Sequence, residues 1–333
     1  MMDARRSAMS RIISVWCLSM VTLVLAAAGD DGQQLNDCSF SMKKQILTCE
    51  RIALKDSNIG NTIGTATQML VIRRSANLTI TPGFHSPPFR LLTSYHLTEC
   101  PDLQVSPFSF QQLPNLKYIK IIDNTYTTVA SNTFYGLVNL EVLSLNNNSI
   151  NTIETDAFNG LSSLETLELT HNNFKTVSAH VFASLHNLRS LFLYHNNIEV
   201  LEDDCLFGLS NLNVLDLTYN RITRIKTAVF DAAPVLTQLY LSFNQIETVE
   251  GDFTSEKLEF LYLQNNKLRN VTDTLFNSLV NLVDVDLSRN KITSFAPDAF
   301  INLTRLNNLN YKDNNLERPV HLQFADKPPL ITS

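Results

Sequence analysis

The chain has 333 residues, of which 44% are hydrophobic and 17% charged, and its formal net charge is −6. This length allows one large domain or two domains of ordinary size. A nucleic-acid partner would need clustered positive charge. After residue 28 the only notable basic pairs are Lys43 with Lys44 and Arg73 with Arg74, which suit solvated surface, so we expect no nucleic-acid binding.

Residues 1–28 have the composition of a cleaved secretory signal peptide. Arg5, Arg6 and Arg11 lead into an apolar run over residues 12–28, and Ala26 and Ala28 stand where a signal peptidase prefers small residues. The run is at the lower edge of the length that crosses a bilayer, so we favour cleavage over a membrane anchor. No second run of about 20 apolar residues and no lipid-anchor tail follows. We therefore expect a secreted, extracellular chain without membrane insertion.

From residue 67 to residue 316 the sequence repeats at an almost constant interval. The frame L-x-x-L-x-L-x-x-N recurs every 24 residues, apart from one interval of 22, which indicates about 10–11 stacked units. A weaker copy from Leu92 has Cys100 at the asparagine position, and another begins at Thr67. The clean copies begin at Leu116, Leu140, Leu164, Leu188, Leu212, Leu236, Leu258, Leu282 and Leu306.

Each part of the repeat has an expected place in a solenoid. The alternation in L-x-x-L-x-L has a period of two, so it predicts a short strand with leucines on one face and variable residues on the other. Strands stacked about 4.8 Å apart would form a parallel sheet whose leucines fill a continuous core. An aromatic spine is expected on the opposite side, ten residues after each asparagine. Its positions are Phe134, Phe158, Phe182, Leu206, Phe230, Phe253 (one residue early), Phe276 and Phe300.

The repeated asparagine is expected to be structural. Where the chain leaves each strand and bends inward, backbone groups lose their ladder partners, and leaving them unpaired costs about 1–3 kcal/mol each. An asparagine side chain carries both donors and an acceptor, so a column of them can satisfy those groups in every turn. The column consists of Asn124, Asn148, Asn172, Asn196, Asn220, Asn244, Asn266 and Asn290.

This frame resembles that of the extracellular leucine-rich repeat family with 24-residue units, which includes the ectodomains of Toll-type receptors, Slit, chaoptin, the acid-labile subunit of growth-factor complexes and secreted immune proteins of insects. The resemblance implies an α/β solenoid, a leucine-rich repeat horseshoe with a concave parallel β-sheet and a mostly irregular or short-helical convex side. It also implies a non-enzymatic protein without cofactors that binds another extracellular protein or receptor on the concave face, in innate immune or cell-surface recognition. A structural or adhesive protein that forms homo- or hetero-oligomers is the alternative.

The N-terminal end of the solenoid is expected to be sealed by a cap over residues 29–66. Cys38 and Cys49 flank a plausible hairpin. A disulfide between them would close a short loop and seal the first repeat, which is the role of the N-terminal cysteine cap in the family that the sequence resembles. At the other end, residues 317–333 form a tail without cysteines. Either Val320 to Phe324 folds over the last turn, or a partner covers that end, or the chain is a truncated product.

The two other cysteines of the repeat region stand too far apart to pair. Cys100 and Cys205 are four repeats apart, about 19 Å, whereas a disulfide needs Cα atoms within about 7 Å. Cys100 is expected to be a buried thiol. Cys205, next to the spine position Leu206, is either a free thiol or one half of an intermolecular disulfide.

Four N-glycosylation sequons begin at Asn77, Asn147, Asn270 and Asn302. Given a secretory route, we expect glycans on some of them. Asn270 and Asn302 are expected on loops away from the strands, and Asn147 at a strand edge.

The outward strand positions are the predicted partner-binding site. Large aromatic side chains gather on four neighbouring strands, a width of about 15 to 20 Å, although the leucine core does not need them there. Aromatic residues with hydroxyl groups and one charge are typical of a binding hot spot. The alternative is that these rings only pack on one another across strands. The predicted site residues are Phe192, Tyr194, Asp216, Tyr219, Tyr240, Phe243, Phe260 and Tyr262.

Two residue pairs would fit an enzyme. His171 and His195 occupy the same place in successive repeats, so they could share a metal ion with Glu168 nearby, although a surface histidine pair is the simpler interpretation. Asp284 and Asp286 project from one strand face about 7 Å apart, within the range of a carboxylate hydrolase, although solvated carboxylates are commoner. Because the sequence holds no nucleophile triad, phosphate loop or cysteine zinc motif, we expect neither catalysis nor a bound metal.

Overall fold

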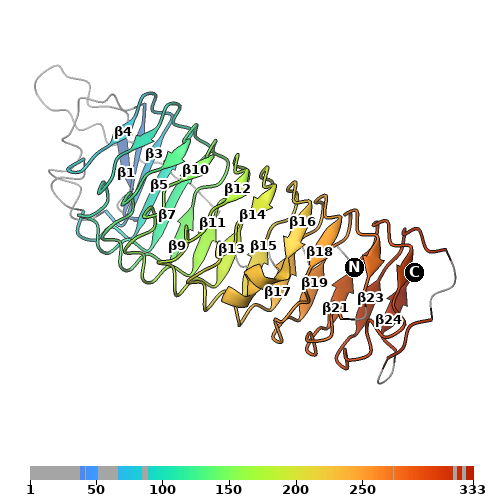
Figure 1. The fold of residues 1–333 in the computed structure, drawn as a ribbon. Helices are drawn as coiled ribbons and strands as arrows, with labels where there is room; N and C mark the ends of the chain where they lie inside the picture. Colours follow the sequence, from blue (N-terminus) through green and yellow to red (C-terminus); the bar gives the residue numbers. More distant parts are fainter. Residues whose placement is uncertain are drawn as a thin grey trace, which may run out of the picture.

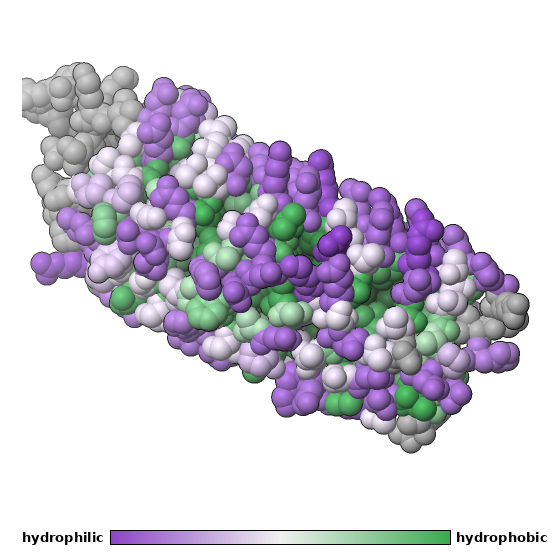
Figure 2. Space-filling view, viewed as in Figure 1, coloured by the Kyte–Doolittle hydropathy of each residue, from purple (hydrophilic) through white to green (hydrophobic). Residues whose placement is uncertain are grey.

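A computed structural model describes residues 38–41, 43–51, 67–84, 89–272, 274–317, 321–324 and 328–333. The predicted signal peptide, residues 1–28, and much of the predicted cap, residues 29–37 and 52–66, lie outside this described part. The repeats stack into an elongated solenoid, with the strands following one another along its length (Figure 1). Hydrophobic residues run along the middle of the visible face and hydrophilic residues border them (Figure 2).

The main sheet contains 14 strands, which pair with one another in the order in which they follow along the chain. Further short strands pair separately and do not belong to this sheet. β1 and β2 pair antiparallel, and every later pair is parallel and in register, as with Leu167 opposite Leu191 and Leu191 opposite Leu215. The expected parallel sheet of repeat strands is therefore confirmed. Its strands are β1 (Cys38–Ser41), β2 (Ile46–Glu50), β3 (Met69–Arg73), β5 (Ser94–Thr98), β7 (Tyr118–Ile122), β9 (Val142–Ser144), β11 (Thr166–Glu168), β13 (Ser190–Phe192), β15 (Val214–Asp216), β17 (Gln238–Tyr240), β19 (Phe260–Tyr262), β21 (Asp284–Asp286), β23 (Asn308–Asn310) and β24 (Leu330–Thr332).

A second set of short strands lies in the returning part of the turns, as pairs rather than one continuous sheet. The rest of the convex side consists of turns, and the one helix within the described ranges is the 3-10 helix η1 (Thr227–Ala232). The expected irregular convex side is confirmed. The pairs are β4 (Thr79–Ile80) with β6 (Gln104–Val105), β8 (Thr128–Val129) with β10 (Thr152–Ile153), β12 (Thr176–Val177) with β14 (Val200–Leu201), β16 (Arg224–Lys226) with β18 (Thr248–Glu250), and β20 (Asn270–Val271) with β22 (Ser294–Phe295).

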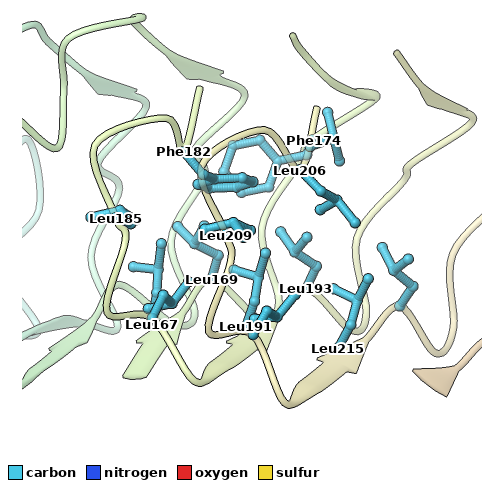
Figure 3. Packing of buried hydrophobic residues seen from close by; sticks show 14 of the residues in the cluster. Leu167, Leu169, Phe174, Phe182, Leu185, Leu191, Leu193, Leu206, Leu209 and Leu215 are labelled. Carbon is cyan, nitrogen blue, oxygen red and sulfur yellow. The ribbon is translucent and has the colours of Figure 1, made fainter. Parts of the chain in front are cut away.

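One continuous hydrophobic core runs through the stack between the strands and the turns. Leucines of successive strands lie below the spine side chains, and Leu206 continues the row beside Phe182 (Figure 3). Phe158 stacks on Phe134 with ring centroids 6.4 Å apart and on Phe182 at 6.1 Å. The predicted spine is confirmed, and it extends to Phe110, whose ring lies 5.8 Å from that of Phe134.

The asparagine column satisfies backbone groups at the bends of the turns, as predicted, although Oδ1 of the buried Asn148 has no hydrogen-bond partner among the described residues. In Asn220 the amide nitrogen donates to the carbonyls of Leu193 and Leu217, both at 3.0 Å, and Oδ1 accepts from the Ile198 N–H at 3.0 Å. Cys100 fills the same place with its thiol, which donates to the Thr98 carbonyl at 3.3 Å. Equivalent sets of bonds involve Asn172, Asn196, Asn244, Asn266, Asn290 and Asn314.

Both ends of the solenoid add strands outside the regular repeat. Cys38 and Cys49 face each other across the β1–β2 hairpin and form the predicted disulfide, with Cα atoms 4.0 Å apart. At the other end, β24 pairs parallel with β23 and so lengthens the main sheet by one strand. Phe324 packs on the last spine ring, 6.4 Å from Phe300, which corresponds to the alternative in which the tail folds over the last turn. Val320 lies outside the described residues.

The thiol of Cys205 is free and buried. This agrees with the free-thiol alternative and disfavours an intermolecular disulfide. Burial raises its pKa to about 12, so the reactive thiolate is scarce at neutral pH. Cys100 is buried as well, as expected, and burial raises its pKa. Neither thiol can reach a partner chain unless the repeat around it opens.

All four sequon asparagines are exposed. Asn147 directly follows the strand-to-turn bend, next to the buried Asn148, in keeping with its predicted place at a strand edge. The prediction of a loop was wrong for Asn270, because this residue begins the short lateral strand β20. That strand pairs with β22 and not with the main sheet, so a glycan there would still leave the main sheet uncovered.

Candidate functional site

The exposed side of the main sheet, which we call the concave face, carries the variable residues of each repeat in rows that follow the strand register. The leucines of β13 to β19 point to the core and are fully buried, so the alternate residues of these strands point outward and are half-buried. The sequence pattern thus fixes which side chains a ligand on this face can touch. The central row runs Glu168, Phe192, Asp216, Tyr240, Tyr262 and Asp286.

Two tyrosines form the middle of the central row. The rings of Tyr240 and Tyr262 stack with centroids 5.2 Å apart and an interplanar angle of 23°. The Tyr240 hydroxyl donates to Gln238 Oε1 at 2.8 Å, which fixes the direction of the ring. Burial, followed by the charges of Asp216 and Asp284, raises the Tyr240 pKa to about 12, so its hydroxyl stays protonated at neutral pH.

Asp216 lies in register between Phe192 and Tyr240. Its Oδ1 accepts the Thr218 backbone N–H at 2.9 Å. Burial nevertheless raises its pKa, because the side-chain and backbone hydrogen bonds from Thr218 do not replace the lost hydration.

A second cluster lies where the strands end, at the residue before each asparagine of the column. This position has φ between 52° and 59° in every repeat from Glu99 to Asp313, a left-handed conformation that turns the chain toward the core. Four successive residues there form a ring ladder, which consists of His171, His195, Tyr219 and Phe243 with centroid spacings of 4.5, 4.4 and 4.2 Å.

The ring ladder presents its edges to solvent. Tyr219 is 39% exposed and Phe243 37%, while Tyr194 stands edge-on to the rings of His171 and His195 at 5.7 Å from each. Burial, followed by the charge of His171, lowers the pKa of His195. The ring ladder offers apolar ring edges together with polar atoms, as binding surfaces do.

The histidine pair and the aspartate pair that would fit an enzyme do not have the geometry or the exposure that the sequence suggested. His171 and His195 stack face to face, whereas imidazole ligands direct their nitrogen lone pairs in the ring plane toward one metal, so this arrangement is not a chelating one. No group of three metal-ligating side chains occurs in the part of the chain that the structure describes. The interpretation of Asp284 and Asp286 as solvated carboxylates was wrong, because they are only 9% and 8% exposed and accept amide bonds from Asn308 and Asn310.

A hollow of about 470 Å³ opens on another side of the molecule, at the break between the lateral strands β10 and β12. Core side chains such as Phe174 and Phe182 form its floor, and Lys175 contributes the charge at its rim. Its lining contains neither a tyrosine nor an acidic residue, whereas the concave face carries both, so we place the candidate site on the concave face.

The eight predicted site residues thus fall into two neighbouring clusters. Tyr194, Tyr219 and Phe243 belong to the ring ladder, together with His171 and His195, which had not been assigned to the binding site. The signal for these histidines was present, since they occupy the repeat position of Tyr219. The rings do pack on one another, as the simpler alternative expected, and they remain partly exposed. The others, Phe192, Asp216, Tyr240, Tyr262 and Phe260, lie on β13 to β19, with Phe260 in the row beside Gln238 and Asp284.

Turns with a buried leucine face, a phenylalanine spine and an asparagine column define the leucine-rich repeat class of solenoids. The family model described as leucine rich repeat matches residues 90–150, 138–198, 187–246 and 256–316, more than half of the chain. The chain therefore belongs to the leucine-rich repeat family. The comparison with curated proteins found no match. Within the described ranges, no helix has the length and apolar character to cross a bilayer.

Several solved structures share this fold. A chain of the TLR13–ssRNA13 complex is similar with a TM-score of 0.61 and 25% identity, covering 82% of this chain and 47% of that one. A chain of the octameric complex of latrophilin 3, Unc5D and FLRT2 has a TM-score of 0.65 and 21% identity, with 83% of both chains covered. A chain of the Drosophila Toll–Spatzle complex has a TM-score of 0.60 and 19% identity, covering 82% of this chain and 40% of that one. This chain spans less than half of the TLR13 and Toll chains.

Proposed function

We propose that this protein is a secreted binding protein that holds another extracellular protein on its concave face, in innate immune or cell-surface recognition. The observation that carries this proposal is the gathering of half-buried aromatic side chains on β13 to β19, over a core that is already filled by leucines. Tyrosines with a fixed ring direction give large contact area at a low cost in conformational entropy, and such residues dominate binding energy in interfaces.

The charge of the concave face supports a protein rather than a nucleic acid as the partner. The central row contains Glu168, Asp216 and Asp286, and the adjacent row contains Asp284. The similar TLR13 chain was solved with ssRNA and the similar Toll chain with Spatzle, so partners of this fold differ in chemistry. An acidic face repels phosphates, because nucleic-acid binding depends on basic groups that neutralise them.

Two features support secretion. The Cys38–Cys49 disulfide suits an oxidising compartment, and the sequon asparagines are exposed where glycans could be attached. Asn147 occupies the position of the ring ladder one repeat before His171, so a glycan there would border the ladder without covering the tyrosine pair.

Replacing Tyr240, Phe260 and Tyr262 together by serine is expected to weaken partner binding about 100-fold or more, because each is a central aromatic contact. The secreted, glycosylated protein would be used to capture its partner from extracellular fluid of the producing organism, and the affinity would be measured by surface plasmon resonance. Full affinity of the triple variant would refute the proposed site.

The matched control replaces three exposed aromatic residues outside the concave face, Phe108, Tyr135 and Phe207, by serine. We expect this variant to bind like the wild type, since these residues lie in convex turns. Equal losses in the two triple variants would indicate a general effect on folding rather than a site.

A structural or adhesive role by self-association is the second candidate. At the end of the main sheet, Leu330 of β24 is 72% exposed and Ile331 is 38% exposed, an apolar strand that a second copy could cover. Light scattering separates the two candidates. A stable monomer that captures one defined protein supports the binding role, whereas assembly that grows with concentration supports the adhesive role.

A further inference from the structure

Asp216 lies between two aromatic residues in the central row of the concave face, and we call the place above it the notch. In the central row, its short side chain stands between the larger rings of Phe192 on β13 and Tyr240 on β17. These two strands are two spacings apart, about 9.6 Å. A flat group placed midway would lie about 4.8 Å from each ring, within the roughly 6 Å over which an aromatic face attracts a cation.

The Asp216 carboxyl group in the notch has no cationic partner, since no lysine, arginine or histidine among the described residues forms an ion pair with it. The nearest cation of the central row is Lys120 on β7, four strands away or about 19 Å, beyond the distance at which salt screens exposed charges. Burial raises the pKa of Asp216 against the hydrogen bonds from Thr218, so a cation placed in the notch would favour the ionised form that burial alone disfavours.

Two further acidic residues near the notch favour a positively charged ligand. Asp284 lies close enough to Tyr240 to act on its hydroxyl group, and Asp286 stands beyond Tyr262 in the central row. A phosphate or a carboxylate would be repelled by these groups. A neutral apolar side chain would fill the space without offering a hydrogen-bond donor to Asp216 Oδ2, which is unfavourable for a sheltered polar group.

We propose that the notch formed by Phe192, Asp216 and Tyr240 binds the guanidinium or ammonium group of an arginine or lysine side chain that the protein partner presents. The cation lies between the two rings, and Asp216 Oδ2 accepts its hydrogen bond while Oδ1 keeps the bond from Thr218. This proposal rests on the proposed function, since it names the chemistry of the partner at the same concave face.

The test uses two fluorescein-labelled peptides of twelve residues, one with four Arg-Gly-Gly units and one in which every arginine is replaced by citrulline. Citrulline keeps the shape of arginine and removes its charge. With the full secreted protein in low-salt buffer, fluorescence anisotropy should show binding of the arginine peptide that is about tenfold or more stronger than that of the citrulline peptide. Equal binding of the two peptides would overturn the proposal.

Two variants locate the binding in the notch. Asp216→Asn keeps the volume and the oxygen that accepts the Thr218 N–H, and we expect about a tenfold loss of arginine-peptide affinity. Phe192→Leu removes one ring wall and should cost about two- to fivefold. The control Asp298→Asn makes the same change of charge in an exposed convex turn and should bind like the wild type. An Asp216→Asn variant that binds like Asp298→Asn would contradict the assignment.

A structural role for Asp216 predicts a different result. Because burial raises its pKa, the folded protein holds this proton more tightly than the unfolded chain, so the ionised carboxylate lowers stability as the pH rises above the ordinary carboxyl range. We therefore expect Asp216→Asn to melt at the same or a higher temperature than the wild type at pH 7. A lower melting temperature with unchanged peptide binding would assign Asp216 to folding instead.

The outcomes for the two proposals can be told apart. If the Tyr240, Phe260 and Tyr262 serine variant loses the captured partner while Asp216→Asn retains both partner and arginine peptide, the concave face is the binding site and the cation notch is refuted. If the serine variant also keeps the partner, the concave-face site on which both proposals rest is refuted.

Discussion

Replacing Phe158 by alanine is expected to lower the free energy of unfolding by about 3–5 kcal/mol. Phe158 is fully buried and stacks on the spine rings of both neighbouring repeats, Phe134 and Phe182. Its removal would leave a cavity that three turns share, and a solenoid has no distant contacts that could compensate, because each repeat packs only against its neighbours. Urea unfolding followed by circular dichroism would measure the loss.

A matched control for this variant is Phe207→Ala. Phe207 is 51% exposed and touches the ring of His180 edge-on at 5.0 Å, so its loss should cost less than about 1 kcal/mol. Equal destabilisation by the two substitutions would mean that the spine is not the part of the core that holds the turns together.

Replacing Asn220 by alanine is expected to destabilise the protein by about 2–4 kcal/mol, the second largest effect. The substitution leaves the buried N–H of Ile198 without an acceptor. The carbonyls of Leu193 and Leu217 keep one bond each, from Asn196 and Asn244, because the column shares every carbonyl between two repeats. Thermal unfolding would report the change as a lowered melting temperature.

Two further variants separate the hydrogen bonds of Asn220 from its packing. Asn220→Asp keeps the shape and the acceptor but replaces the donor nitrogen with a buried charge, so it should be at least as destabilising as alanine. Asn211→Ala removes an exposed asparagine whose amide donates to the His186 carbonyl, and it should cost less than about 1 kcal/mol. An Asn220→Ala variant as stable as Asn211→Ala would contradict the role of the column.

The repeat frame predicted the parts of the fold that recur. Leu191, Phe158 and Asn220 could each be placed because the same residue type returns at the same position in neighbouring copies, and one strand cannot bury its leucines alone. Residues without a copy could not be placed in this way. Leu330 to Thr332 add β24 to the sheet, although they have no asparagine column or spine residue of their own.

The candidate site was predicted in outline but not in its packing. The strand alternation correctly placed Tyr240 and Tyr262 outward. The alternation within one strand could not show that Asp216 lies between Phe192 and Tyr240. That arrangement depends on which residues of the neighbouring strands stand opposite it. Likewise, the ring ladder depends on the left-handed backbone conformation at Tyr219. Glycine and asparagine are the residues that usually indicate this conformation, and a tyrosine does not.

Hydroxyl-radical footprinting of the protein with its captured partner is the most direct measurement of where the partner sits. Tyrosine and phenylalanine are readily oxidised, so we expect Tyr240, Tyr262 and Phe192 to be oxidised severalfold less in the complex than in the free protein. Tyr135 and Phe207, which are exposed in convex turns, should be oxidised equally in both. Protection of Tyr135 and Phe207, with the concave residues oxidised as in the free protein, would contradict binding on the concave face.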